Sequence, residues 1–132
     1  MTSIFSKIVS REIPAYIVAE NENYLAFLDI MPLTKGHALV IPKIETDYIF
    51  DLDDTMFSGL HIFAKKVAIA IKKEIKCNRI GIAVIGMEVP HAHIHLIPIN
   101  SMDDMNFQNK KLKLPPQEME AIADKIKSSF SN

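Results

Sequence analysis

The sequence predicts an α+β fold in which an antiparallel sheet of about five strands has helices packed on one side. Two observations predict it. Five short β-branched or alternating segments are bounded by turn residues, and helical periodicity occurs in only three places. Strands and helices therefore do not alternate as they do in parallel α/β proteins. Because 132 residues are enough for one hydrophobic core, we expect a single domain over residues 1–132.

A short first helix is predicted where four apolar residues recur at helical spacing after Ser3, a residue type that caps helices: Ile4, Phe5, Ile8 and Val9. The five expected strands are short apolar runs bounded by turns: residues 16–20, 24–30, 37–41, 79–85 and 92–99.

The longest helix is predicted from about residue 53 to 76, where six apolar residues form one face: Leu60, Phe63, Ala64, Val67, Ile71 and Ile75. Lysines gather toward its C-terminal end, where their charge complements the helix dipole. The C-terminal part, residues 101–130, is predicted to be a loop over 101–114 followed by a helix. That last helix opens at Pro115-Pro116 and has one apolar face: Met119, Ile122, Ala123 and Ile126.

Composition excludes several classes of protein. A net charge of −1 gives no basic footprint for nucleic acid. Cys77 is the only cysteine, so no intrachain disulfide can form. Charged residues at positions 7, 11 and 12 interrupt the N-terminus, and no apolar stretch reaches the ~18 residues of a membrane helix. We therefore expect a cytoplasmic protein with neither nucleic-acid nor membrane partners.

Three of the five histidines occupy alternate positions in one short run, at His91, His93 and His95. Alternate residues of a strand point to the same side. We therefore expect the three imidazoles on one face, with the intervening side chains in the helix-covered core: Ala92, Ile94 and Leu96. A single strand histidine is usually structural, whereas three in strict alternation indicate a functional site.

Two chemistries fit such a row. A metal ion is the first, but the outer rings are about 13 Å apart at ~3.3 Å per residue, so one ion with ~2.0 Å bonds takes only two of them. Glu88 and His37 are the residues available as further ligands. Phosphate chemistry is the second, and it uses all three rings, since imidazoles near neutral pH neutralise phosphate, attack phosphorus and donate protons.

The triad motif over residues 91–97 resembles the signature of the histidine-triad (HIT) family. Four further segments resemble the N-terminal half of that family in the same order: residues 4–8, 12–15, 26–32 and 36–43. The resemblance covers roughly residues 3–99. It implies a HIT-like fold, a homodimer with two joined sheets, and a small-molecule nucleotide substrate.

The resemblance also implies a role for each histidine. His93 would be the nucleophile that forms a nucleotidyl-histidine intermediate, which water then hydrolyses. His91 would set the orientation of that ring, and His95 would contact phosphate and assist the leaving group. His37, from another strand, would border the phosphate site. A histidine at position 95, where related nucleotidyltransferases have glutamine, favours the hydrolase branch.

Further residues would bind the substrate. Asp29 would accept hydrogen bonds from the ribose hydroxyls. An apolar slot around the base would be formed by four residues: Phe5, Ile8, Ile13 and Ile30. In the loop before the triad we expect Glu88 and Val89 to border the substrate, with nearby backbone amides on phosphate oxygens. Glu88 stands where relatives often have a hydroxyl, and we hypothesise that it favours amine leaving groups.

Two features depart from the family. Many bacterial members hold a structural zinc with two N-terminal cysteines, a histidine after the third strand and the first triad histidine. The three positions before the triad are here Ser3, Ser6 and Glu45, so we expect no metal and no cofactor. The loop before the triad is also shortened, to residues 85–89.

The function expected from the sequence is hydrolysis of a nucleoside phosphate or phosphoramidate at the α-phosphorus, with adenosine substrates and a covalent intermediate on His93. Two alternatives stay open. One is a metal-binding β domain that uses two of the three triad histidines with Glu88. The other is a nucleotide-binding regulator that turns over slowly or not at all.

Overall fold

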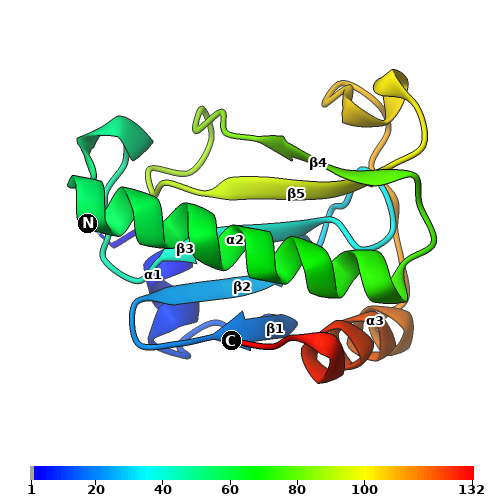
Figure 1. The fold of residues 1–132 in the computed structure, drawn as a ribbon, viewed down its shortest axis with the longest axis horizontal. Helices are drawn as coiled ribbons and strands as arrows, with labels where there is room; N and C mark the ends of the chain where they lie inside the picture. The colour runs from blue at the N-terminus through cyan, green and yellow to red at the C-terminus, as the bar shows by residue number, and fades with distance from the viewer. Residues whose placement is uncertain (1) are drawn as a thin grey trace.

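The computed structural model describes residues 2–132 and contains a five-stranded antiparallel sheet (Figure 1). The strands are β1 (Ile17–Glu20), β2 (Tyr24–Leu28), β3 (Ala38–Pro42), β4 (Arg79–Ala83) and β5 (Ile94–Ile99). Their order across the sheet is β1-β2-β3-β5-β4, so β3 and β5 are neighbours although about fifty residues separate them in the sequence. The predicted α+β class and the number of strands are confirmed.

Two long helices, α2 (Asp54–Glu74) and α3 (Pro116–Ser129), pack on one face of the sheet and cover the larger core. Asp53 caps α2 by accepting a hydrogen bond from the Met56 amide. The predicted apolar faces of both helices are buried in this core, with Ile75 partly buried at its edge. No helix among residues 2–132 combines the length and the apolar character needed to cross a membrane.

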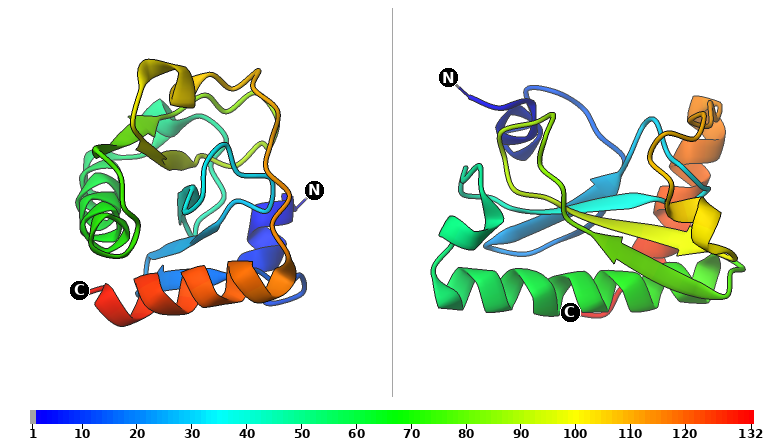
Figure 2. Two further views of the ribbon diagram at one scale, coloured as in Figure 1. Left: turned by 90° about the vertical axis from the view of Figure 1, so that its right-hand side faces the viewer. Right: turned by 90° about the horizontal axis from the view of Figure 1, so that it is seen from above.

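The short helix α1 (Ile4–Val9) lies on the opposite face of the sheet from α2 (Figure 2). Its buried residues Phe5 and Ile8 pack against alternate residues of the two central strands: Leu25, Phe27, Leu39 and Ile41. Every residue of β2 and β3 is buried, so both faces of these strands need cover. The expectation that helices lie on one side therefore holds for the two long helices, and α1 covers the other side.

Element boundaries differ from the expectation in several places. Residues 45–52 and 101–114 contain the 3₁₀ helices η1 (Ile49–Asp51) and η2 (Met102–Met105), and β2 and β4 each end two residues earlier than expected. A capping box between Ser101 and Asp104 explains η2. Strand β5 begins at Ile94 and not at residue 92, because the amide of Ala92 turns away from β3 to bond the carbonyl of Thr46.

Candidate active site

Four histidines lie together on the side of the sheet that faces α1. His37 directly precedes β3, His91 and His93 directly precede β5, and His95 lies on β5 opposite Leu39. All four are at most 9% exposed. The alternating residues Ala92, Ile94 and Leu96 belong to the helix-covered core. The expected division of residues 91–96 between two faces is therefore confirmed, although the first three residues precede the strand.

His93 is held by the backbone of the triad itself. Its Nδ1 lies 2.7 Å from the carbonyl oxygen of His91. A carbonyl only accepts, so Nδ1 carries the proton and Nε2 keeps its lone pair. Phe5 of α1 meets the imidazole edge-on, with ring centroids 5.0 Å apart. The orientation gives His93 a free nucleophilic nitrogen.

His37 and His95 form a chain of hydrogen bonds with fixed direction. The Leu33 amide donates to Nδ1 of His37 at 3.0 Å, so the proton of the neutral His37 ring resides on Nε2. That Nε2–H points at Nδ1 of His95, also at 3.0 Å. His95 therefore accepts at Nδ1 and keeps its own proton on Nε2. This ring presents a proton donor, whereas the neighbouring ring of His93 presents a lone pair.

Burial keeps both rings of this chain neutral. Burial, followed by the charges of His95 and Lys111, lowers the pKa of His37 from 6.5 to about 3. Burial, followed by the charge of His93, lowers the pKa of His95 to about 4. Neither ring is protonated near neutral pH, so the hydrogen-bond directions hold there.

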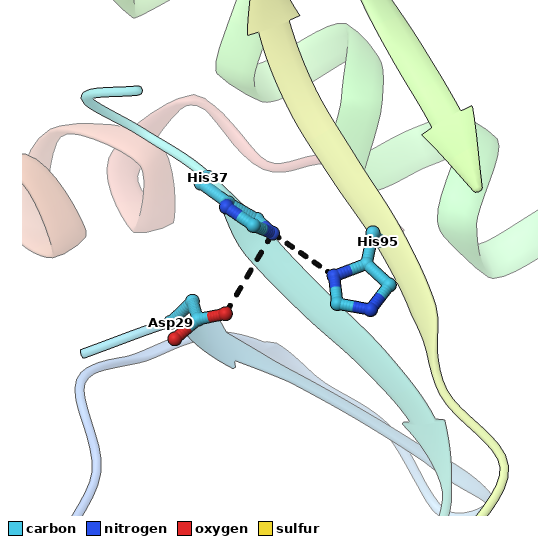
Figure 3. Close-up of side chains that lie close together, drawn as sticks. All are labelled: Asp29, His37 and His95. Atoms are coloured by element: carbon cyan, nitrogen blue, oxygen red, sulfur yellow. Dashed lines mark hydrogen bonds and ion pairs between the residues drawn. The ribbon is translucent and has the colours of Figure 1, made fainter. Parts of the chain in front are cut away.

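Asp29 follows the last residue of β2 and points toward His37 (Figure 3). Its Oδ1 accepts the Met31 amide at 2.9 Å, and its Oδ2 lies 3.7 Å from Nε2 of His37. Burial raises the pKa of Asp29, against the lowering effect of the Met31 hydrogen bond. The side chain is 22% exposed, so this carboxylate can accept a hydrogen bond from a ligand.

Asp29, His37 and His95 also offer ligand atoms within 4.8 Å of one another (Figure 3). A metal ion there would need the lone pair of His37 Nε2. The Leu33 amide occupies Nδ1 and so places the ring proton on Nε2. The positive charge of Lys111, which lowers the pKa of His37, also opposes a cation. The arrangement fits a hydrogen-bonded chain better than a metal site.

Three of the four residues expected around the base lie together. Phe5 and Ile8 belong to the smaller core cluster, and Ile13 and Val89 pack against it. Ile30 differs, because β2 ends at Leu28 and the Ile30 side chain is 71% exposed in the following turn. The structure does not bring Ile30 into this cluster.

The loop before the triad brings Glu88 near the site. Its side chain is exposed, and its charge contributes to the raised pKa of Asp29 after burial. Gly86 has a φ of +75°, a conformation that glycine adopts at little cost. Val89 accepts the amide of His91 at 2.8 Å, which closes the loop onto the triad. Val89 therefore contacts the triad and the charge of Glu88 acts on Asp29, while the expectation that both residues border the substrate stays a prediction.

The C-terminal loop supplies two residues that sequence reasoning missed. Phe107 meets the His95 ring edge-on at 4.9 Å and the His37 ring at 6.4 Å. Lys111 donates to the carbonyls of Phe107 and Asn109, and its charge acts on Asp29 and His37. The sequence shows a basic cluster at residues 110–113 but no pattern that places it against the triad.

Four side chains at the positions that the family resemblance compares with zinc ligands also lie together: Ser3, Ser6, Glu45 and His91. Zinc is bound by thiolates, imidazoles and carboxylates, whereas two of these groups are neutral hydroxyls. The nitrogen that His91 turns toward them, Nδ1, lies at hydrogen-bond distance from Ser3 Oγ, 2.9 Å. These residues do not fit a zinc ion.

Comparison with known proteins agrees with this geometry. Residues 10–102 match the HIT domain. The adenosine 5′-monophosphoramidase of Schizosaccharomyces pombe is 37% identical over 134 residues, covering 98% of this chain and 99% of its own. The crystal structure of a HIT-like protein involved in cell-cycle regulation from Bartonella henselae has a TM-score of 0.84 at 30% identity, covering 98% of this chain and 97% of that one.

A Zn-bound histidine triad family protein from Mycobacterium smegmatis has a TM-score of 0.80 at 28% identity, covering 98% of this chain and 93% of that one. The fold and the row of histidines define a histidine-triad domain. This chain belongs to the HIT family, which confirms the resemblance seen in the sequence.

Proposed function

We propose that this protein is a nucleotide hydrolase that cleaves adenosine phosphoramidates and related nucleoside phosphates at the α-phosphorus. One observation supports it above all. His93 presents the lone pair of Nε2 next to His95, which presents Nε2–H, with ring centroids 5.0 Å apart. A nucleophile and a proton donor side by side suit displacement at phosphorus. The name of the Schizosaccharomyces pombe relative supports a phosphoramidate substrate.

The reaction has two displacements. In the first, Nε2 of His93 bonds to the phosphorus while the bond from phosphorus to the leaving nitrogen breaks; Nε2–H of His95 donates a hydrogen bond to that nitrogen, which takes up a proton from solvent and leaves as a neutral amine. In the second, water attacks the phosphorus, the bond to His93 breaks, and a proton of the water passes to solvent. The net change is addition of water across the phosphorus–nitrogen bond, which yields a nucleoside monophosphate and a free amine.

The surrounding residues suit the other parts of a nucleotide. Asp29 accepts the ribose hydroxyls, and the apolar side chains of Phe5, Ile8 and Ile13 border the base. His37 and His91 support the reacting rings, and backbone amides of residues 86–89 stabilise the phosphate oxygens. The positive charge of Lys111 near Asp29 and His37 favours an anionic substrate. Ile30 can contact the base only if the exposed turn that carries it changes conformation.

A homodimer belongs to this proposal. Strand β4 is at the edge of the sheet, and its exposed Ile82 is followed by the exposed Val84. Ile62 and Ile69 are exposed on the neighbouring helix α2. An apolar edge strand beside an apolar helix face suits pairing with a second copy across β4. Sedimentation or light scattering of Ile82→Lys against wild type tests it: wild type is expected to be a dimer and the variant a monomer.

The activity itself is tested with adenosine 5′-phosphoramidate as substrate. Wild type is expected to release AMP and ammonia. His93→Ala is expected to lower kcat by several orders of magnitude while AMP still binds, because the nucleophile is lost and the nucleotide contacts remain. Near-wild-type turnover in His93→Ala would refute the covalent mechanism, and a wild type that binds AMP without turnover would favour a regulator.

A further inference from the structure

Glu45 fixes the start of α1 from a distant part of the chain. It lies in the loop after β3, and its Oε1 accepts two hydrogen bonds, from the Ser3 amide and the Ser6 hydroxyl, both at 2.6 Å. The Ser6 hydroxyl, followed by the Ser3 amide, lowers the pKa of Glu45 to about 2. The carboxylate is therefore charged at any working pH, and it ties the first turn of α1 to the end of β3.

The bonding continues from Ser3 to His91. Ser3 is 5% exposed and His91 is fully buried, and Ser3 Oγ lies 2.9 Å from Nδ1 of His91. On the other side of the ring, Nε2 lies 2.8 Å from the carbonyl oxygen of Pro42, so Nε2 carries the proton. Burial lowers the pKa of His91, so the ring is neutral and Nδ1 is an acceptor. Ser3 must therefore donate its hydroxyl proton to His91.

Each hydroxyl proton then has one near acceptor, because the 3.4 Å approach of Ser3 Oγ to Ser6 Oγ is longer than the contact of Ser3 with His91. The hydroxyl proton of Ser6 goes to Glu45, at 2.6 Å. Ser6 therefore has no proton left to donate to Nδ1 of His91, which lies farther away at 3.4 Å. The proton of Ser3 goes to His91, while Ser3 Oγ accepts the Ser6 amide as the helix cap. The chain of bonds runs in one direction, and it is satisfied by the tautomer of His91 that the Pro42 carbonyl requires.

We propose that Ser3, Ser6 and Glu45 are positioning residues that replace a metal: they hold the Nδ1 side of the His91 ring, opposite the Pro42 carbonyl, and thereby fix the His91 carbonyl that orients the nucleophile His93. That carbonyl accepts Nδ1–H of His93 at 2.7 Å. The same three residues hold α1, from which Phe5 meets the rings of His91 and His93 edge-on. The kinetic part of this inference rests on the proposed hydrolase function, and the structural part does not.

Capping of α1 alone does not explain the arrangement. A cap needs only the bond from the Ser6 amide to Ser3 Oγ, which is present at 3.0 Å. It needs neither a second hydroxyl bonded to Glu45 nor a buried Ser3 hydroxyl that donates to His91. A buried acceptor without a donor is costly, so loss of the Ser3 hydroxyl removes one of the two hydrogen bonds that hold the His91 ring and leaves only the bond to the Pro42 carbonyl.

The test compares Ser3→Ala, Glu45→Ala and Glu45→Gln with the control Glu12→Ala. Glu12 also accepts a serine hydroxyl, that of Ser10 just after α1, but has no bond to His91. Two readouts are used: ¹⁵N chemical shifts of the His91 ring in the free protein, and the single-turnover rate of AMP release from adenosine 5′-phosphoramidate.

Ser3→Ala is expected to change the ¹⁵N shift of His91 Nδ1, which loses its donor while the Pro42 carbonyl keeps the proton on Nε2, and to slow turnover about tenfold. Glu45→Ala is expected to act in the same direction, and its effect is expected to add little to that of Ser3→Ala in the double variant. Glu45→Gln is expected to restore the rate, since an amide oxygen accepts the same two hydrogens. Glu12→Ala is expected to match wild type.

An unchanged ¹⁵N shift of His91 Nδ1 in Ser3→Ala would overturn the proposal, and so would an equal loss of rate in Glu12→Ala and Glu45→Ala. Because Glu45 is exposed, its variants are expected to fold. If wild type has no turnover, the proposed hydrolase function fails by itself, and the ¹⁵N shifts still decide whether Ser3 holds the His91 ring.

Discussion

Acidification is expected to destabilise the protein through the buried pair His37 and His95. Both have a pKa that is lowered in the folded state, from 6.5 to about 3 and about 4. Below pH 6.5 the unfolded chain therefore binds protons that the folded chain does not, so the free energy of unfolding falls as the pH falls.

The size of the effect follows from the two pKa values. Between pH 7.5 and pH 5 each ring lowers the free energy of unfolding by about 2 kcal/mol, at about 1.4 kcal/mol per pKa unit. The two rings together therefore lower it by about 4 kcal/mol. The raised pKa of Asp29 has the opposite sign and offsets part of this loss. A decrease of several kcal/mol is a large fraction of the stability of a small domain.

Urea denaturation at pH 7.5, 6.5, 5.5 and 5.0 measures this loss directly. His95→Gln is expected to remove about half of the pH-dependent loss, since one of the two titrating rings is gone. Gln117→Ala, at an exposed position of α3, is the control and is expected to keep the wild-type slope because it removes no titrating group. A free energy of unfolding that stays constant over this range, or an equal change of slope in both variants, would show that the two rings do not cause the loss.

Three further predictions concern metal, ribose and leaving group. Exhaustive chelation is expected to leave turnover unchanged, because the group formed by Ser3, Ser6 and Glu45 does not suit zinc, and the protonated Nε2 of His37 does not suit it either. A requirement for stoichiometric zinc in turnover would contradict this. Asp29→Ala is expected to raise KM, and use of a 2′,3′-dideoxy substrate is expected to raise the KM of this variant little further. If the free-energy effects of the two changes simply add, Asp29 is not the residue that contacts the sugar. Glu88→Ser is expected to slow hydrolysis of an adenylyl-lysine substrate more than that of a dinucleoside polyphosphate, because a nearby carboxylate favours a cationic leaving group; equal effects would make Glu88 a bystander.

Strand periodicity was enough to predict which side chains of residues 91–96 share a face. The rule needs only extended backbone, and it holds at His91 and His93 even though β5 begins at Ile94. Helical periodicity likewise predicted the buried faces of α2 and α3. Both predictions depend only on the regular direction of side chains along a strand or a helix, which the spacing of residues in the sequence shows directly.

Tertiary contacts account for what the sequence did not predict. The position of α1 opposite α2 follows from the two-sided burial of β2 and β3, which a short apolar run does not reveal. Phe107 reaches His95 only because the C-terminal loop folds back, with the Leu112 amide bonded to the Pro32 carbonyl. The ring tautomers depend on single backbone groups such as the Leu33 amide, for which no sequence pattern exists.

Attack by Nε2 of His93 on phosphorus leaves a covalent intermediate that can be trapped. Wild type mixed with adenosine 5′-phosphoramidate is quenched within one turnover, digested and analysed by mass spectrometry. We expect an adenylyl group on the peptide that contains His93, and no such adduct in His93→Ala. Full release of AMP with no adduct at any time, or an adduct on His91 or His95 instead, would contradict this mechanism.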